Sequence, residues 1–137
     1  MIPEEIFVDT GAWVALADKD DSHHKQAVSL FPSLLKTKRS LVTSNLVIAE
    51  TYIILLKELG HRAAICFLER LRASPRIKKV YSDEDVEEEA EGILRKYSDQ
   101  DFSYADAVSF VMMRRHRIKT AFCFDSHFST SSFIVIP

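Results

Sequence analysis

Short apolar runs alternate along this chain with longer segments of helical periodicity. The runs are rich in β-branched and aromatic residues, as β-strands are, and they occupy residues 6–8, 41–43, 77–81, 120–124 and 133–136. Strands that are apolar on both faces are typical of parallel sheets covered on both sides by helices. The segments between them predict those helices, at residues 11–17, 22–36, 45–59, 61–73, 83–97 and 103–115. We therefore predict an α/β/α sandwich around a central parallel sheet of about five short strands.

Three of the predicted helices contain residues that indicate where a helix ends, bends or faces solvent. Gly60 is a good C-terminal stop for the helix at 45–59, which is apolar almost all round and is therefore expected to be buried. Pro32 predicts a kink or break within 22–36. The acidic run at 83–91 falls in the first turns of a helix, where the helix dipole favours acids, so we interpret it as a solvated face.

Length and composition predict one domain over residues 1–137. Hydrophobic residues make up 47% of the 137 residues, with only three glycines and four prolines, so the chain is neither disordered nor fibrous. Its apolar runs are shorter than the roughly 18 residues of a membrane span. Cys66 and Cys123 lie in apolar surroundings without metal-binding or redox spacing. We interpret both as reduced core thiols and expect a cytoplasmic protein without a membrane segment.

Four carboxylates occur next to or within apolar stretches: Asp9, Glu50, Asp106 and Asp125. An acid among apolar neighbours is costly unless it is paired or coordinates a metal. Asp9 and Asp125 each follow a predicted strand, and sites in open α/β sheets form beyond the carboxyl ends of strands. The joint pattern predicts one acidic cluster that holds divalent cations. Because all four ligands offer oxygen, Mg²⁺ or Mn²⁺ is expected rather than zinc.

Each acid also has a purely structural interpretation. Asp9 and Asp125 could be helix N-caps, and Asp106 could complete a capping box with Ser103. Glu50 could pair with a buried arginine or with backbone donors. No single acid decides between the two interpretations, and only the four taken together favour a metal site.

Five segments of the chain resemble the PIN domain family, and within it the VapC-type toxin ribonucleases. These segments are 7–13, 24–27, 43–51, 101–107 and 122–128, and they span nearly the whole chain. The resemblance implies an acidic pocket of Asp9, Glu50, Asp106 and Asp125 that is both catalytic and metal-binding. It adds Thr10 and Ser103 as supporting hydroxyls and Asp99 as an outer acid. Ser126 departs from the family, because many relatives carry a basic residue at that place.

The function implied by this resemblance is Mg²⁺- or Mn²⁺-dependent hydrolysis of RNA phosphodiester bonds. VapC-type toxins also imply a small antitoxin partner and a homodimer. Arg114, Arg115 and Arg117 could contact phosphates, although the whole chain has a net charge of −2. The pattern identifies neither the RNA that is cut nor whether the enzyme is a toxin or a housekeeping nuclease.

Two alternatives belong to other classes. One is a PIN-like module that binds RNA or a protein without cleaving, against which the four intact acids argue. The other is a phosphorylation-dependent receiver domain, which would need adjacent acids after the first strand and a lysine after the fifth.

Overall fold

A computed structural model describes residues 4–37 and 39–137. Its elements follow one another as β1 (Ile6–Val8), α1 (Thr10–Ala17), α2 (His24–Lys36), β2 (Leu41–Ser44), α3 (Asn45–Leu59), α4 (His61–Ala73), β3 (Ile77–Val80), α5 (Glu84–Lys96), α6 (Tyr104–Arg115), β4 (Thr120–Phe122), α7 (His127–Thr130) and β5 (Ile134–Ile136). The five strands form one sheet in the order β3-β2-β1-β4-β5. Every pair of neighbouring strands is parallel.

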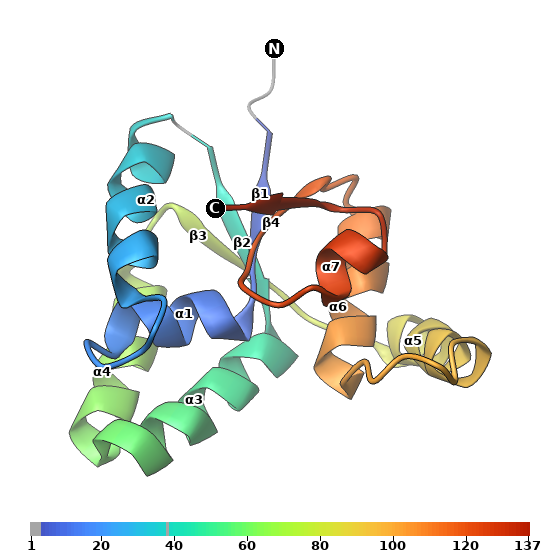
Figure 1. Cartoon of the computed structure of the whole chain (residues 1–137), viewed down its shortest axis with the longest axis horizontal. Coiled ribbons are helices and arrows are strands. Elements are labelled where there is room, and N and C mark those ends of the chain that lie inside the picture. The colour runs from blue at the N-terminus through green and yellow to red at the C-terminus, as the bar shows by residue number, and fades with distance from the viewer. Residues whose placement is uncertain (1–3, 38) are drawn as a thin grey trace.

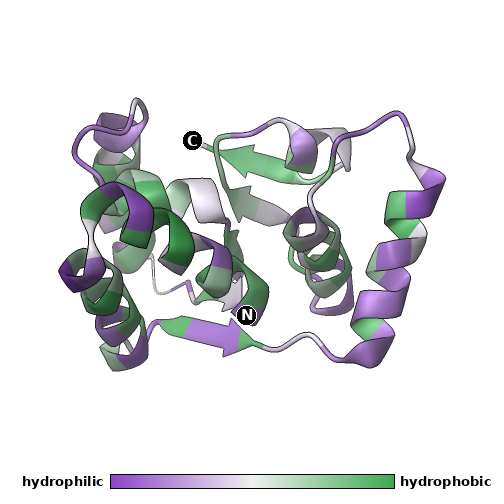
Figure 2. Ribbon diagram, turned by 90° about the horizontal axis from the view of Figure 1, so that it is seen from below, coloured by the Kyte–Doolittle hydropathy of each residue, from purple (hydrophilic) through white to green (hydrophobic). Residues whose placement is uncertain are grey.

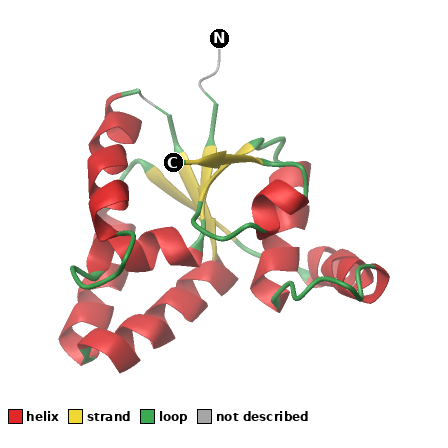
Figure 3. Cartoon of the chain, viewed as in Figure 1, coloured by secondary structure: helices red, strands yellow, loops and turns green. Residues whose placement is uncertain are grey.

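The helices cover both faces of this sheet. α1, α2 and α4 lie on one side and α5, α6 and α7 on the other, while α3 packs against α1 and α4 (Figures 1 and 3). The predicted α/β/α sandwich with five parallel strands is therefore confirmed. The strand order also excludes a receiver domain, whose sheet has the order 2-1-3-4-5.

The centre of the sheet is the apolar core. All residues of β1 and β4 are buried, and Phe7 in β1 pairs with Val42 in β2 and Ala121 in β4. The edge strand β3 differs, because its two central residues, Lys78 and Lys79, are exposed. Figure 2 shows hydrophilic and hydrophobic residues along the ribbon. Charged side chains are usual on an edge strand, where they discourage pairing with another sheet.

Several details differ from the sequence predictions. α2 runs through Pro32 without a break, because this residue is exposed and water can solvate the carbonyl that loses its partner. α3 is not buried all round, since Ile53 and Leu59 are 42% and 40% exposed. Gly60 ends α3 as predicted, with a positive φ of 95°. Cys123 is buried, but Cys66 is only partly so and lines a surface groove rather than the core.

The short helix α7 was not predicted, and an aromatic cluster holds it in place. Phe128 is fully buried, and its ring lies 5.1 Å from that of Phe110 in α6 and 6.3 Å from that of Phe7 in β1. This packing holds α7 against α6 and β1. Of the helices in the described ranges, none is long and apolar enough to cross a membrane.

Candidate active site

The predicted acids lie beyond the carboxyl ends of the central strands. Asp9 follows β1 directly, and its backbone N–H donates to the carbonyl oxygen of Phe122, the last residue of β4, at 3.1 Å. Asp125 comes three residues after β4. Asp106 sits in the first turn of α6, and Glu50 lies on α3, which begins where β2 ends. The ends of β1 and β4, the helix α3 that follows β2, and the start of α6, which precedes β4, thus bring the four positions together beyond the carboxyl ends of the strands.

Asp9 is the most deeply buried of the four, with 5% of its surface exposed. Its pKa is raised to about 8, chiefly by burial and to a smaller extent by the charges of Asp125, Asp106 and Glu50, while the backbone amide of Thr10 acts against the rise. The side chain of Asp9 makes no helix-capping hydrogen bond, although the residue occupies the N-cap position of α1. The four carboxylates therefore share one electrostatic environment, centred on an acid that capping does not explain.

The hydroxyl of Thr10 is a second unusual group beside Asp9. Thr10 is buried, and its Oγ1 has no hydrogen-bond partner among the described residues. Buried polar atoms are nearly always satisfied by protein or by ordered water, so an orphaned hydroxyl at an acidic cluster fits a site that takes up a polar ligand.

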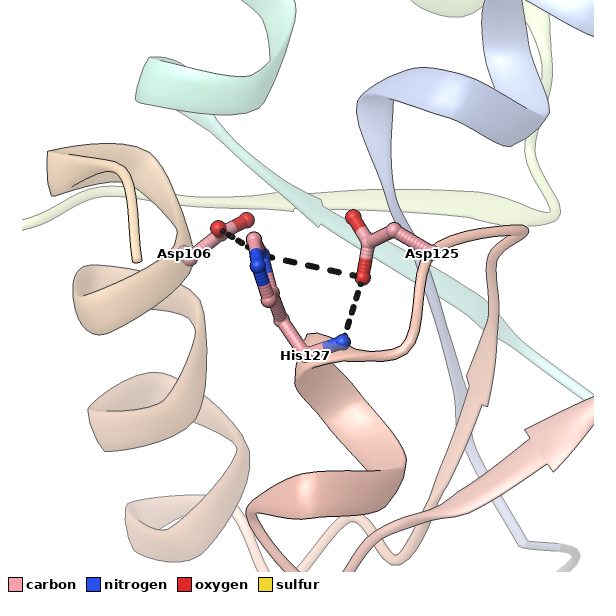
Figure 4. Close-up of side chains that lie close together, drawn as sticks. All are labelled: Asp106, Asp125 and His127. Carbon is pink, nitrogen blue, oxygen red and sulfur yellow. Dashed lines mark hydrogen bonds and ion pairs between the residues drawn. The ribbon is translucent and has the colours of Figure 1, made fainter. Parts of the chain in front are cut away.

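Asp106 does form the capping box that its spacing with Ser103 suggested. Its backbone N–H donates to Ser103 Oγ at 3.0 Å, and its Oδ2 accepts from the Ser103 backbone N–H at 3.0 Å. The same Oδ2 also accepts from His127 Nδ1 at 2.8 Å (Figure 4). In residues 4–37 and 39–137, no group donates a hydrogen bond to Oδ1 of Asp106. Capping and membership of the acidic cluster are thus compatible, because capping occupies one oxygen only.

His127 is a site residue that the sequence pattern did not identify, and Asp101 is its partner. The two ring nitrogens of His127 face Asp106 Oδ2 at 2.8 Å and Asp101 Oδ1 at 2.9 Å. When the ring is protonated, each of its two nitrogens can donate a hydrogen bond to the carboxylate that it faces. Burial disfavours the charged ring, but the hydrogen bonds to Asp101 and Asp106 outweigh burial and raise the pKa of His127. The only sequence signal was its place two residues after Asp125 in a segment of family resemblance.

Asp125 lies at the exposed rim of the cluster. Its Oδ1 accepts from the backbone N–H of His127 at 2.9 Å, a local turn that supports the start of α7. Partial burial and the nearby charge of Asp106 raise its pKa, although His127 and backbone amides act against this. Asp106, Asp125 and His127 each offer one ligand atom within 4.8 Å of the other two (Figure 4).

Three other predicted residues, Glu50, Asp99 and Ser126, lie in different surroundings. Glu50 is half-buried, and its carboxylate has no ion pair or hydrogen bond with any other described residue. Asp99 is exposed and lines a separate hollow of about 280 Å³ together with Arg114 and Thr130. The structure thus places Asp101, rather than Asp99, in contact with the cluster through His127. Ser126 is exposed at the N-terminus of α7.

The donor set suits a hard divalent cation. Carboxylates dominate it, they repel one another, and the charge of one cation would offset that repulsion. The unpartnered Thr10 hydroxyl and the free Oδ1 of Asp106 add oxygen atoms that the protein leaves unsatisfied. The cluster in the structure is therefore compatible with metal binding.

The basic end of α6 is partly engaged by other side chains. Arg115 Nε lies 3.4 Å from Glu89 Oε2, and the Arg114 guanidinium lies over the ring of Phe133 at 5.5 Å. Arg117 is exposed and has a positive φ of 57°.

Similarity to known proteins gives the family of this chain. Residues 6–133 match the model of the PIN domain family. The chain is 35% identical over 131 residues to the 23S rRNA-specific endonuclease VapC20 of Mycobacterium tuberculosis, covering 96% of this chain and 97% of that protein. The crystal structure of VapC20, described as a toxin that cleaves the sarcin-ricin loop, superposes with a TM-score of 0.87 over 96% of this chain and 99% of that one.

More distant solved structures share the fold. VapBC2 of Rickettsia felis, bound to promoter DNA, has a TM-score of 0.71 at 13% identity, and FitAcB of Neisseria gonorrhoeae has 0.67 at 18% identity; each match covers 96% of both chains. The match to the PIN family and the identity to VapC20 confirm the resemblance that the five sequence segments indicated.

Proposed function

Because this chain belongs to the PIN domain family, we propose that it is an endoribonuclease that hydrolyses RNA phosphodiester bonds with Mg²⁺ or Mn²⁺. The observation that carries this proposal is the convergence of four carboxylates beyond the carboxyl ends of the central strands, where burial first and the charges of the three other acids second raise the pKa of Asp9 to about 8. VapC20 is named for action on 23S rRNA, so ribosomal RNA, and its sarcin-ricin loop first, is the proposed substrate.

Asp9, Glu50, Asp106 and Asp125 would hold the cation, with Thr10 and Ser103 in support. The bound cation supplies a water of lowered pKa and offsets negative charge on the phosphate. The protein residues then have distinct tasks. Asp9 fixes the deep end of the site because it is buried, whereas Asp125 faces solvent at the rim, where a substrate strand enters. Glu50, which has no protein partner in the described ranges, has a carboxylate available to orient a water.

A PIN-like module that binds RNA or a protein without cleaving is the alternative, and a cleavage assay separates the two. The purified chain should cut a sarcin-ricin loop oligonucleotide or intact 23S rRNA in Mn²⁺ and should leave it whole in EDTA. RNA that stays intact in Mn²⁺ while still binding the chain would support the silent module. Equal cleavage with Mn²⁺ and with EDTA would contradict the metal requirement.

We further propose a small antitoxin as the protein partner, in a groove of about 600 Å³. Its walls come from α1, α2, α4 and β3, and they are mainly apolar, with Trp13, Phe31 and Leu71 among the lining residues. Such a groove fits the apolar face of an amphipathic segment. Lys19 and Arg70, which also line it, favour an acidic segment. A partner bound there should suppress cleavage in the same assay, and a partner without effect would contradict its role as antitoxin.

We also propose a homodimer and a cytoplasmic location, where ribosomal RNA is found. Ile53 and Leu59 give α3 an exposed apolar surface that a second copy could cover. Light scattering at micromolar concentration measures the mass of the particle and so tests the dimer.

A further inference from the structure

His127 links two helices at the acidic cluster through hydrogen bonds on both sides of its ring. Nδ1 lies 2.8 Å from Asp106 Oδ2 in α6 (Figure 4). Nε2 lies 2.9 Å from Asp101 Oδ1 in the loop before α6. The ring also packs edge-on against Phe102, with centroids 5.3 Å apart. Phe128, the next residue, is fully buried in the core, so the backbone that carries the ring is fixed as well.

The two donors on Asp106 act on the same oxygen. Oδ2 accepts from the Ser103 backbone N–H, within the capping box of α6, and from His127, which belongs to α7. Two donors from different elements fix the torsion of the carboxylate more firmly than the capping box alone can. With Oδ2 occupied in this way, Oδ1 is the atom left to contact a ligand.

We propose that His127 is a positioning residue, which holds the Asp106 carboxylate so that Oδ1 alone faces the metal site, and that Asp101 orients the His127 ring. This inference rests on the proposed function, because it concerns the same metal. Both ring nitrogens are engaged by carboxylates, so His127 acts through Asp106 and does not bind the cation itself. Hydrogen-bond partners of metal ligands commonly contribute about 10- to 100-fold to metal affinity or activity.

Isosteric replacements of His127 can separate its two hydrogen bonds. The amide nitrogen of asparagine takes nearly the place of Nδ1, whereas that of glutamine lies nearer to Nε2. We therefore expect His127→Ala to weaken Mn²⁺ binding by about 10- to 100-fold. His127→Asn should restore most of the Mn²⁺ affinity, because it keeps the donor to Asp106. His127→Gln should not restore it.

Calorimetric titration with Mn²⁺ alone measures the affinity, and a thermal melt of each metal-free variant checks that it is folded. Asp101→Asn should weaken binding less than His127→Ala does, since the Asp101 side chain is 95% exposed. His61→Gln, at an exposed position at the start of α4, serves as the matched control and should bind Mn²⁺ as the wild type does.

Three outcomes would overturn the inference. One is a Mn²⁺ affinity of His127→Ala equal to that of the wild type. Another is an equal loss of Mn²⁺ affinity in His127→Asn and His127→Gln, because a merely structural role of His127 would affect both variants alike. The third is a directly coordinated nitrogen in the electron spin-echo spectrum of the Mn²⁺ complex, which would make His127 a ligand. A separate result would contradict the proposed function alone. In that result the variants show the expected order of Mn²⁺ affinities, but the wild-type chain does not cut RNA.

Discussion

Replacing Asp9 by asparagine should stabilise the metal-free protein at neutral pH and at the same time abolish RNA cleavage. The pKa of Asp9 rises from 3.8 to about 8 in the fold, so the folded state binds a proton more tightly than the unfolded state does. Between these values the unfolded chain is ionised and the folded chain resists ionisation. The free energy of unfolding of the metal-free protein should therefore fall as pH rises from about 4 to about 8.

The size of this change in stability follows from the shift in the pKa of Asp9. One pKa unit corresponds to about 1.4 kcal/mol, so the raised pKa of Asp9 should lower the free energy of unfolding at pH 7 by on the order of 4 kcal/mol relative to acid pH. The asparagine side chain in Asp9→Asn carries no charge and should remove most of this dependence on pH, with a melting temperature about 10 °C or more above that of the wild type. Thermal melts of both proteins in EDTA from pH 5 to about pH 8 measure the difference. Glu58→Gln, an exposed acid on α3, is the control and should change little. An Asp9→Asn protein that is less stable than the wild type at pH 8 would contradict the raised pKa of Asp9.

Asp125→Asn should reduce RNA cleavage by a factor on the order of 10² to 10³, which is typical for loss of one group that stabilises charge in a transition state. It should leave the stability of the metal-free protein nearly unchanged, because the Asp125 side chain is 42% exposed and asparagine can still accept the hydrogen bond from the His127 backbone N–H. If Asp125 only supported the turn into α7, the variant would cut RNA normally. A cleavage time course in Mn²⁺, beside a melt in EDTA, separates the two roles. Asp20→Asn, at an exposed loop position, should keep wild-type activity.

Most of the fold was predictable because its signals are local. Continuous apolar runs predict the central strands β1, β2 and β4, which are buried on both faces. The edge strands β3 and β5 also lie where strands were predicted, although they are partly exposed. The prediction was wrong where tertiary packing decides, as for the outer face of α3, which the rest of the domain does not cover. α7 has only four residues, too few for a periodic pattern, and it exists because Phe128 is buried.

The candidate site was predictable to a similar degree. The four acids were identified from their apolar surroundings, and the structure brings them to one edge of the sheet. The contact between His127 and Asp101 joins residues 26 positions apart, and a local sequence pattern cannot predict such a pair. The capping box of Asp106 shows why one acid is ambiguous in isolation: the same side chain caps α6 through one oxygen and leaves the other free.

The central claim is that Asp9, Glu50, Asp106 and Asp125 form one metal site. Anomalous diffraction from a crystal soaked in Mn²⁺ tests it most directly, because the signal locates the ion without reference to activity. The predicted result is a peak within coordination distance of Asp9, Asp106 and Asp125, which is lost in Asp125→Asn at the same Mn²⁺ concentration. A peak that lies elsewhere on the molecule, or an empty cluster at Mn²⁺ concentrations that support cleavage, would contradict the claim.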